Sequence, residues 1–292
     1  MNIGIFGRSV TDENLQYVQR VVDKLALKKC KIFIFKPFYK ALINSVNFPT
    51  DIILYEQHEE IRDKIEVLFS IGGDGTILDA IAIIRDSGIP IMGINIGRLG
   101  FLASLAKNEI LQAIDNVLNK QYDLDQRTLI KLSLPAGLFG DWNYALNEMA
   151  ITRKDSISLI ALHVYVDNVF LSTYWADGLI VATPTGSTAY SLSCGGPILM
   201  PASENFVITP IAPHNLTVRP FVIPDKSRIR IIVEGRDENF FISLDSRTTA
   251  IRSNFEMIVD RADFKVNLIQ LKGKDFFGTI REKMKWGLDA RN

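Results

Sequence analysis

Ser70-Ile71-Gly72-Gly73-Asp74-Gly75-Thr76 follows directly on the apolar run Val67-Leu68-Phe69. The apolar run predicts a strand, the glycines a tight turn, and the pattern from about Thr76 to Arg85 a helix. Glycine has no Cβ, so a ligand can approach the main chain closely. Because the first N–H groups of a helix lack partners and favour anions, we expect this turn to bind phosphate groups.

Asp74 does not fit a simple phosphate cradle, because its carboxylate repels an anion. The carboxylate has a place there if it takes a proton, binds a metal ion or accepts a hydrogen bond from a sugar hydroxyl. The alternative without function is a plain strand-to-helix turn in which Asp74 or Thr76 caps the helix. Three glycines around one aspartate, directly after a strand, favour the phosphate-binding turn over this alternative.

The composition is that of an ordinary globular protein, with 47% hydrophobic and 23% charged residues among 292. This length favours two domains. The 33 basic residues equal the 33 acidic ones, so no net charge attracts nucleic acid or an anionic membrane. No apolar stretch approaches the roughly 18 residues that span a bilayer. We therefore expect no nucleic-acid partner and no membrane association.

The cysteines, the histidines and the first residues indicate the compartment. Cys30 and Cys194 are too few for a disulfide scaffold, which fits a reducing cytoplasm. Residues 1–6 predict a strand without a basic start, which argues against a signal peptide. His58, His163 and His214 are scattered and show no metal-ligand spacing. We expect a cytoplasmic protein without a structural zinc site.

Before about residue 120, short apolar runs alternate with helical patterns, which predicts a Rossmann-like α/β domain with a mostly parallel sheet. Ligands bind outside the carboxyl ends of such strands, where the glycine-rich turn falls. The expected strands are residues 2–6, 31–35, 51–54, 66–70 and 90–94, and the expected helices are 11–28, 76–85 and 108–120.

After residue 121, short strands separated by turn residues predict a mostly antiparallel, sandwich-like all-β domain. Asp167-Asn168 is expected as a two-residue hairpin turn. The tail 276–286 predicts an amphipathic helix that returns to the first domain, so the domains are 1–120 plus 272–292 and 121–271. The expected strands are 129–134, 144–152, 159–166, 169–174, 179–182, 228–233, 240–244, 256–259 and 265–270.

Three further clusters carry polar or glycine residues at the ends of expected strands. The stretch 93–102 holds three glycines and is a candidate functional loop. Its alternative interpretation is a loop that only connects two elements. Asn147-Glu148 places two polar side chains at the end of an apolar segment and is a second candidate. Its alternative interpretation is a strand edge that faces solvent. Asp177 precedes an apolar strand and a run of small hydroxylated residues with Tyr190, which offers amides, hydroxyls and a planar ring to a polar ligand. The alternative for that run is a tight turn and a small-residue helix.

Taken together, these clusters resemble the ordered motif set of the NAD kinases. GGDGT alone is shared with diacylglycerol and sphingosine kinases and with phosphofructokinases, whereas the set in this order is specific. The matching motifs are GGDGT at 72–76, GINIGRLGFL at 93–102, LNE at 146–148, DGLIVATPTGSTAYSLS at 177–193 with GGP at 195–197, ITPIAPH at 208–214 with LTVRP at 216–220, and REKMKW at 281–286.

The resemblance implies transfer of the γ-phosphoryl group of ATP, or of another phosphate donor, to the 2′-hydroxyl of the adenosine ribose of NAD, giving NADP. It also implies a divalent ion, usually Mg²⁺, and a homotetramer or homodimer. The first domain would bind the nucleotide and the β-rich domain NAD. The motifs assign no metal ligands.

Carried onto this sequence, the resemblance makes Asp74 the general base toward the ribose hydroxyl. Asn147 and Glu148 resemble the pair that holds ribose and adenine groups, and Asp177 the acid that contacts the dinucleotide. The residues implied for ATP phosphates are Gly72, Gly73, Gly75 and Thr76. Those implied for NAD also include Asp74, Gly75, Thr188, Ala189, Tyr190, Ser191, Leu192, Ser193 and Ala212.

Arg247 stands where relatives often carry glutamine, in the stretch Asp245-Ser246-Arg247. Its guanidinium suits a phosphate of the dinucleotide. The alternative is a solvent-facing charge at a strand end. Two other functions stay open at this point: a lipid kinase of the diacylglycerol or sphingosine type, which needs an apolar acceptor pocket, and a non-catalytic dinucleotide sensor, which has no need of Asp74.

Overall fold

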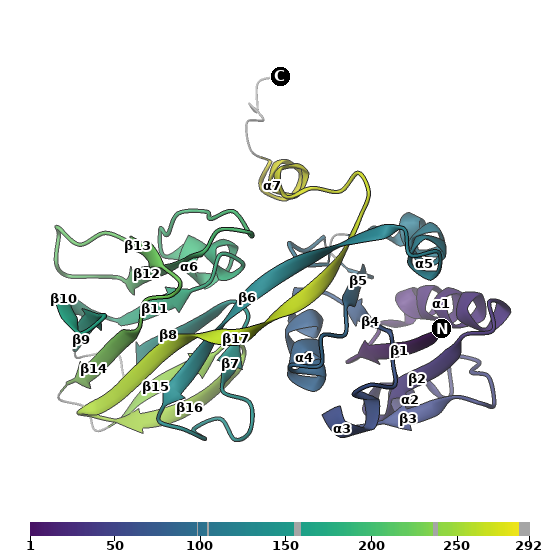
Figure 1. Ribbon diagram of the computed structural model, residues 1–292, viewed down its shortest axis with the longest axis horizontal. Helices are drawn as coiled ribbons and strands as arrows, with labels where there is room; N and C mark the ends of the chain where they lie inside the picture. Colours follow the sequence, from purple (N-terminus) through teal and green to yellow (C-terminus); the bar gives the residue numbers. More distant parts are fainter. Residues whose placement is uncertain (98, 104, 155–158, 236–238, 286–292) are drawn as a thin grey trace. The chain divides into compact units, whose positions relative to one another are not determined.

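A computed structural model describes residues 1–97, 99–103, 105–154, 159–235 and 239–285 (Figure 1). The chain folds as two compact units. Unit 1 is Met1–Gln126 with Val266–Asn292, and unit 2 is Arg127–Lys265. These limits lie within the long strands β6 and β17, which run from one unit into the other, a few residues from the expected limits 120/121 and 271/272.

Unit 1 contains a parallel sheet in the order β3-β2-β1-β4-β5, which confirms the predicted βαβ pattern. β1 and β4 lie at its centre, with Ile5 opposite Phe69, and both are buried along almost their whole length. The strands are β1 (Asn2–Gly7), β2 (Lys31–Phe35), β3 (Ile53–Tyr55), β4 (Val67–Gly72) and β5 (Ile91–Asn95).

Amphipathic helices cover this sheet. In α1 the residues Val18, Val21, Val22 and Leu25 follow helical spacing and are buried against β1 and β2 in one apolar cluster. Each such side chain contributes about 1.5–3 kcal/mol by leaving water. The helices of unit 1 are α1 (Leu15–Leu27), α2 (Lys36–Leu42), α3 (His58–Ile61), α4 (Asp74–Ile84), α5 (Ile110–Leu118) and α7 (Phe276–Met284), with 3₁₀ turns at Asp12–Asn14 and Lys107–Glu109.

Unit 2 is built mainly from antiparallel strands, as predicted, with a 3₁₀ turn at Gly186–Thr188 and the short helix α6 (Tyr190–Ser193) after β11. One sheet has the order β13-β12-β11-β8-β15-β16, and the other contains β10-β9-β14-β17 with β6 and β7. Inward side chains of both sheets form one apolar core. The strands are β6 (Tyr122–Leu134), β7 (Tyr144–Ala145), β8 (Glu148–Arg153), β9 (Ile160–Val166), β10 (Val169–Ala176), β11 (Gly178–Ala182), β12 (Asn205–Ile211), β13 (Phe221–Pro224), β14 (Ile229–Glu234), β15 (Asn239–Leu244), β16 (Arg247–Arg252) and β17 (Phe255–Leu271).

Two strand predictions in unit 2 are wrong in detail. The segments 256–259 and 265–270 are one continuous strand, β17, and the segment 144–152 is broken between β7 and β8. The break leaves Leu146 and Asn147 outside the strands, so their N–H groups are available to another partner. The hairpin turn at Asp167-Asn168 is confirmed, because both residues have the positive φ that a type I′ turn requires.

The C-terminal helix α7 belongs to unit 1, as expected. Asp275 caps its start by accepting a hydrogen bond from the N–H of Gly278 at 2.6 Å. Trp286, at the end of the expected helix, lies outside the described residues. In the described part of the chain, no helix has both the length and the apolar character needed to cross a membrane.

Gly178 provides a stability test of unit 2. A Cβ at this position would overlap the carbonyl oxygen of Ile151 on the neighbouring strand β8 and lie 2.9 Å from Cδ1 of Ile211. Because a paired backbone cannot move away without losing its hydrogen bonds, we expect Gly178→Ala to lower the free energy of unfolding by about 2 kcal/mol. Urea denaturation measures the change.

Gly75→Ala is the matched control, because no atom lies within 4 Å of a Cβ built there. It is expected to leave the unfolding free energy unchanged or slightly higher. A Gly178→Ala variant that loses less than about 0.5 kcal/mol, the range of an ordinary surface change, would contradict the packing argument.

Candidate functional site

The glycine-rich turn joins β4 to α4 in unit 1, as the sequence predicted. Gly73 precedes the helix, which begins at Asp74. A Cβ at Gly72 would collide with the side chain of Thr76, so glycine is needed there for packing. A Cβ at Gly73 or Gly75 would meet open space instead. The start of the helix therefore has open space at Gly73 and Gly75, next to backbone N–H groups that lack partners within the helix. This combination suits an anionic ligand.

The carboxylate of Asp74 accepts three backbone hydrogen bonds from the glycine-rich loop after β5. The N–H of Phe101 donates to Oδ2 at 2.8 Å, and those of Leu102 and Ala103 donate to Oδ1 at 3.0 and 2.9 Å. A Cβ at Gly100 would overlap this carboxylate, which explains one glycine of the loop. The second glycine cluster therefore forms a cage around Asp74 rather than a separate site.

Asn95, buried at the end of β5, holds the same loop from its other side. Its Nδ2 donates to the carbonyl oxygen of Ala103 at 3.0 Å, and its Oδ1 accepts from the N–H of Gly97 at 2.7 Å. These bonds fix the backbone whose N–H groups reach Asp74. Arg98, part of the same motif, lies outside the described residues.

Lys283 of α7 brings a positive charge to Asp74. Its Nζ lies 3.9 Å from Oδ2 of Asp74 and 4.7 Å from the centre of the Phe101 ring. The side chain of Lys283 is 33% exposed and that of Asp74 30%, so both remain open to a ligand. Lys283 is not among the site residues predicted from the sequence, although it lies in the REKMKW motif at 281–286.

In unit 2, Asn147 and Glu148 lie where the chain passes from β7 to β8. The carboxylate of Asp245 accepts hydrogen bonds from the N–H groups of Leu146 at 2.9 Å, Asn147 at 2.8 Å and Glu148 at 3.3 Å. Asp245 stands in the turn from β15 to β16 and has a positive φ. This role of Asp245 was not predicted, because its contacts join residues about a hundred positions apart in the sequence.

Glu148 is a buried carboxyl group with an altered affinity for protons. Burial, followed by the nearby charge of Asp245, raises its pKa to about 8, although the N–H of Tyr190 opposes the shift by donating a hydrogen bond. Within the described part of the chain, its buried Oε2 has no hydrogen-bond partner. A buried oxygen of this kind suits a hydroxyl or amino group of a ligand.

The small-residue run 183–193 packs against the Asn147 loop. A Cβ at Gly186 would overlap the carbonyl oxygen of Asn147, and the Thr183 hydroxyl donates to the carbonyl oxygen of Leu146 at 2.5 Å. The Ser191 hydroxyl is bonded to that of Thr209 at 2.8 Å and is buried. The hydroxyls of Thr183 and Ser191, which lie in the run expected to bind a ligand, are therefore used in hydrogen bonds within the protein.

The remaining predicted residues of this run are accessible to different degrees. Tyr190, the first residue of α6 (Tyr190–Ser193), is 42% exposed. Ser193 is exposed, whereas Thr188, Ala189 and Leu192 are half-buried. The Thr188 hydroxyl bonds to the carbonyl oxygen of Thr185 at 3.0 Å. The tyrosine ring is therefore the largest surface that this segment presents to a planar ligand.

Asp177 lies beside Arg153 and close to the end of β12. Nη2 of Arg153 donates to Oδ2 of Asp177 at 3.0 Å, and the N–H of Asp177 donates to the carbonyl oxygen of Ile211 at 2.9 Å. The next residue after Ile211, Ala212, is exposed and has φ +44°. A positive φ is rare for alanine and is found where surroundings impose it, often at ligand sites. Arg153 was not predicted.

The guanidinium of Arg247 contacts backbone carbonyls. Its Nη1 and Nη2 donate to the carbonyl oxygens of Trp142 and Tyr144, and its Cζ lies 5.7 Å from the centre of the Phe139 ring. Arg247 thus holds the chain just before β7 and at its first residue, while Asp245 holds the chain just after β7. The two residues are anchors for the loop that carries Asn147 and Glu148.

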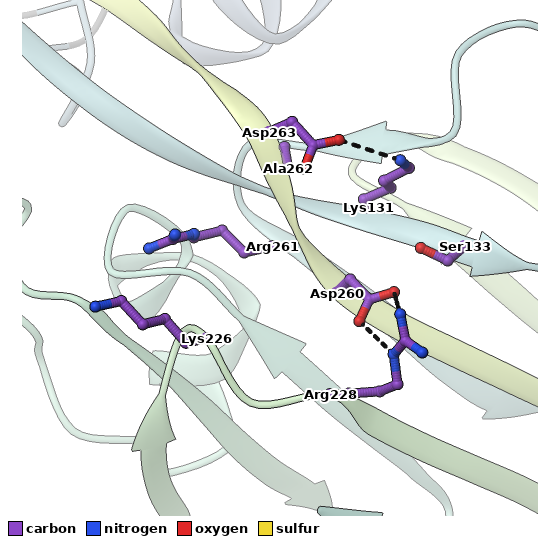
Figure 2. A pocket seen from close by; sticks show the side chains of 8 residues that line it. All are labelled: Lys131, Ser133, Lys226, Arg228, Asp260, Arg261, Ala262 and Asp263. Atoms are coloured by element: carbon purple, nitrogen blue, oxygen red, sulfur yellow. Dashed lines mark hydrogen bonds and ion pairs between the residues drawn. The ribbon is translucent and has the colours of Figure 1, made fainter. Parts of the chain in front are cut away.

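A depression of about 490 Å³ in unit 2 contains none of the predicted site residues (Figure 2). Its charges are paired, because Arg228 contacts Asp260 at 2.8 Å, Lys131 contacts Asp263 at 3.5 Å, and Arg261 contacts Asp225 at 3.0 Å. An anion would have to displace these carboxylates, so this depression is not the candidate site. It is lined by Lys131, Ser133, Lys226, Arg228, Asp260, Arg261, Ala262 and Asp263.

The described residues contain no group of three or more His, Cys, Asp or Glu side chains that could hold a metal ion. Mg²⁺ keeps several waters and is commonly bound through substrate phosphates and one or two carboxylates. A Mg²⁺ ion at this site would therefore depend on the phosphates of a nucleotide for its ligands, because three backbone N–H groups already bond to the Asp74 carboxylate.

Both halves of the chain match models of one protein family. Residues 3–122 match the ATP-NAD kinase N-terminal domain, and residues 146–271 match the ATP-NAD kinase C-terminal domain. The NAD kinase of Cytophaga hutchinsonii is 46% identical over 293 residues, and that of Flavobacterium psychrophilum is 41% identical over 294; the alignments cover 100% of each chain. The NAD kinase of Bacteroides fragilis is 38% identical over 295 residues, again with full coverage.

Solved structures show the same fold. Yeast NADH kinase complexed with NADH has a TM-score of 0.86 at 22% identity, covering 99% of this chain and 88% of the yeast chain. The NAD kinase from Archaeoglobus fulgidus in complex with ATP has a TM-score of 0.73 at 24% identity, covering 96% of this chain and 99% of the archaeal one.

Glu148 predicts a pH dependence of stability. The folded protein holds the proton up to about pH 8, whereas the unfolded chain releases it near the ordinary value of 4.5. The unfolded state therefore binds fewer protons in this window, and the contribution of Glu148 to stability falls as the pH rises from about 4.5 to about 8. Glu148→Gln removes this contribution.

We compare the free energies of unfolding of Glu148→Gln and the wild type by urea denaturation. The value for the variant minus that for the wild type is expected to increase by at least ~1 kcal/mol between roughly pH 6 and pH 8.5. Glu204→Gln, at an exposed glutamate, is the control and is expected to show no such change. An equal difference between Glu148→Gln and the wild type at both pH values would show that Glu148 ionises normally.

Proposed function

The chain belongs to the NAD kinase family, and on this premise we infer that it transfers the γ-phosphoryl group of ATP, or of another phosphate donor, to the 2′-hydroxyl of the adenosine ribose of NAD, giving NADP. The observation that carries the assignment of roles is the Asp74 carboxylate, fixed by three N–H groups at the start of α4. Because the full-length relatives are NAD kinases, the lipid kinase and the sensor are not retained.

Asp74 acts as the base toward the ribose hydroxyl. A carboxylate offers about four lone-pair sites, and three backbone N–H groups occupy three of them. One site is left for the 2′-hydroxyl, and the cage fixes the direction from which that hydroxyl approaches. A base in this position takes the proton as the oxygen attacks phosphorus, which is worth ~10²–10⁴ in rate.

The phosphates of ATP bind at the start of α4. The open space at Gly73 and Gly75 supports this assignment, because a side chain there would fill the space a phosphate needs. A Mg²⁺ ion bound to the triphosphate would neutralise part of the charge of these phosphates. Gly72 and Thr76 keep the shape of the turn through their mutual packing.

In unit 2, the adenosine part of NAD binds at Asn147, Glu148 and the segment 188–193. The buried Oε2 of Glu148, which has no partner among the described residues, supports this, because ribose hydroxyls and the adenine amino group are donors. The exposed ring of Tyr190 offers a face to a planar base. Asp177, Ala212 and Arg247 complete the dinucleotide contacts implied by the family.

A coupled assay tests the function. Purified protein is supplied with NAD, ATP and Mg²⁺, and NADP is detected with an NADP-specific dehydrogenase. NADP formation that depends on all three components is expected. No NADP above the rate without protein would reject the assignment, and parallel assays with NADH, other triphosphates and polyphosphate define acceptor and donor.

Asp74→Asn separates catalysis from binding. The amide keeps the size of the side chain but cannot take the hydroxyl proton, so kcat is expected to fall by ~10² or more while the affinity for NAD stays within a few-fold. Steady-state kinetics and calorimetric titration with NAD measure the two effects. Asp79→Asn is the control on the same helix, where the carboxylate pairs with Arg8 instead. Near wild-type turnover of Asp74→Asn would remove Asp74 from the role of base.

The active form is a cytoplasmic homo-oligomer, a dimer or tetramer. The free cysteines Cys30 and Cys194 support the compartment. Strand β10 supports the assembly, because it ends the sheet order on its side and carries the exposed apolar residues Val169, Phe170 and Trp175. Large exposed apolar side chains gathered on one strand mark an interface.

Val169→Asp is expected to shift the protein toward monomers in size-exclusion chromatography with light scattering, because a charge would be buried in the interface. Leu27→Asp is the matched control, since Leu27 is 76% exposed and Val169 71%. A monomeric wild type, or an unchanged oligomer in Val169→Asp, would contradict the assignment of β10.

A further inference from the structure

The transfer of a phosphoryl group requires cationic groups beside the phosphorus, because negative charge spreads over its oxygens in the transition state. The sequence has no GxxxxGK motif to supply a lysine from the phosphate-binding turn. Lys283, at the opposite end of the chain, brings its ammonium to Asp74. Resting on the function proposed above, we propose that Lys283 is a catalytic residue that binds the transferring phosphoryl group of the donor.

Among the described residues, the contacts of Lys283 leave the hydrogen-bond donors of its ammonium available. The 3.9 Å from Nζ to Oδ2 of Asp74 is too long for a hydrogen bond, whose usual N–H···O range is roughly 2.7–3.2 Å. The Phe101 ring attracts the ammonium electrostatically from 4.7 Å and does not use its N–H donors in the way an oxygen does. Asp74 already accepts three backbone hydrogen bonds, so a simple structural ion pair is not needed to satisfy it.

The start of α7 is anchored, so that Lys283 has a defined position. The ammonium of Lys274 pairs with Glu109 at 2.9 Å, and Nε2 of Gln270 donates to the carbonyl oxygen of Lys274 at 2.7 Å. Asp275 then caps the helix, and Ile280 is buried one turn before Lys283. A cation in the last turn is also favoured by the helix dipole. The helix therefore serves to deliver one ammonium to the carboxylate at which the acceptor hydroxyl reacts.

In the step itself, the 2′-oxygen forms a bond to the γ-phosphorus, and its proton passes to Asp74. The bond from the γ-phosphorus to the oxygen that bridges it to the β-phosphate breaks, and its electron pair leaves with ADP. Lys283 stays protonated throughout and donates hydrogen bonds to an oxygen of the phosphoryl group that is being transferred. Its charge also offsets the repulsion between the incoming phosphate and the carboxylate of Asp74.

Lys283→Met tests the proposal with the full-length enzyme, because Met keeps the length of the stem and removes the charge. We expect kcat to fall by ~10² and the affinity for the non-hydrolysable donor β,γ-imido-ATP with Mg²⁺, measured by calorimetry, to fall about tenfold. Lys283→Arg retains a cation and is expected to recover at least a tenth of wild-type kcat. Lys272→Met, which removes an exposed charge from the same terminal segment, is the matched control.

Lys283→Gln repeats the test if the Met variant does not fold, as judged by circular dichroism. A kcat within threefold of wild type in Lys283→Met or Lys283→Gln would overturn the proposal. So would a loss of kcat that Lys283→Arg does not restore and that leaves the affinity for β,γ-imido-ATP unchanged, since Lys283 would then act only on the position of Asp74. A wild-type enzyme that forms no NADP would instead reject the function of the whole chain, which is a distinguishable failure.

Discussion

The interaction on which the candidate site depends is the capture of the Asp74 carboxylate by the backbone N–H groups of Phe101, Leu102 and Ala103. It gives a charged side chain a fixed direction at the start of α4, where an anion is otherwise favoured. The glycine at position 100 and the side chain of Asn95 are required by the same cage. The parallel sheet contributes by ending β4 and β5 side by side, so that both glycine-rich segments leave the sheet at one place.

Unit 2 contains a second carboxylate that accepts hydrogen bonds from consecutive backbone N–H groups, and there it fixes a loop next to Glu148. The Asp245 carboxylate takes the N–H groups of residues 146–148, and Arg247 takes the carbonyls of Trp142 and Tyr144. One turn between β15 and β16 thus fixes both sides of the short strand β7. The carboxyl group of Glu148 is left buried with a pKa of about 8, and a donor from a ligand would relieve the orphaned oxygen. The carboxylates of Asp74 and Asp245 therefore both hold a loop in place by accepting hydrogen bonds from its backbone N–H groups.

The sequence predicted what is local. The strand-turn-helix at Gly72–Thr76 follows from adjacent residues, and the parallel and antiparallel sheets follow from the spacing of apolar runs. The partners of Asp74 and the roles of Asp245, Arg153 and Lys283 were not predicted, because each joins segments that only the fold brings together. Hydroxyls in the run 183–193 looked available to a ligand because the sequence does not show which of them the fold uses.

The most direct test is the distance from the Asp74 carboxylate to the ribose in a crystal of the protein soaked with NAD. The account predicts that the 2′-oxygen lies within hydrogen-bond reach of an Asp74 oxygen, about 2.6–3.2 Å, with the N–H groups of residues 101–103 still bonded to that carboxylate. A 2′-oxygen bound elsewhere, with no direct or single-water contact to Asp74, would contradict it.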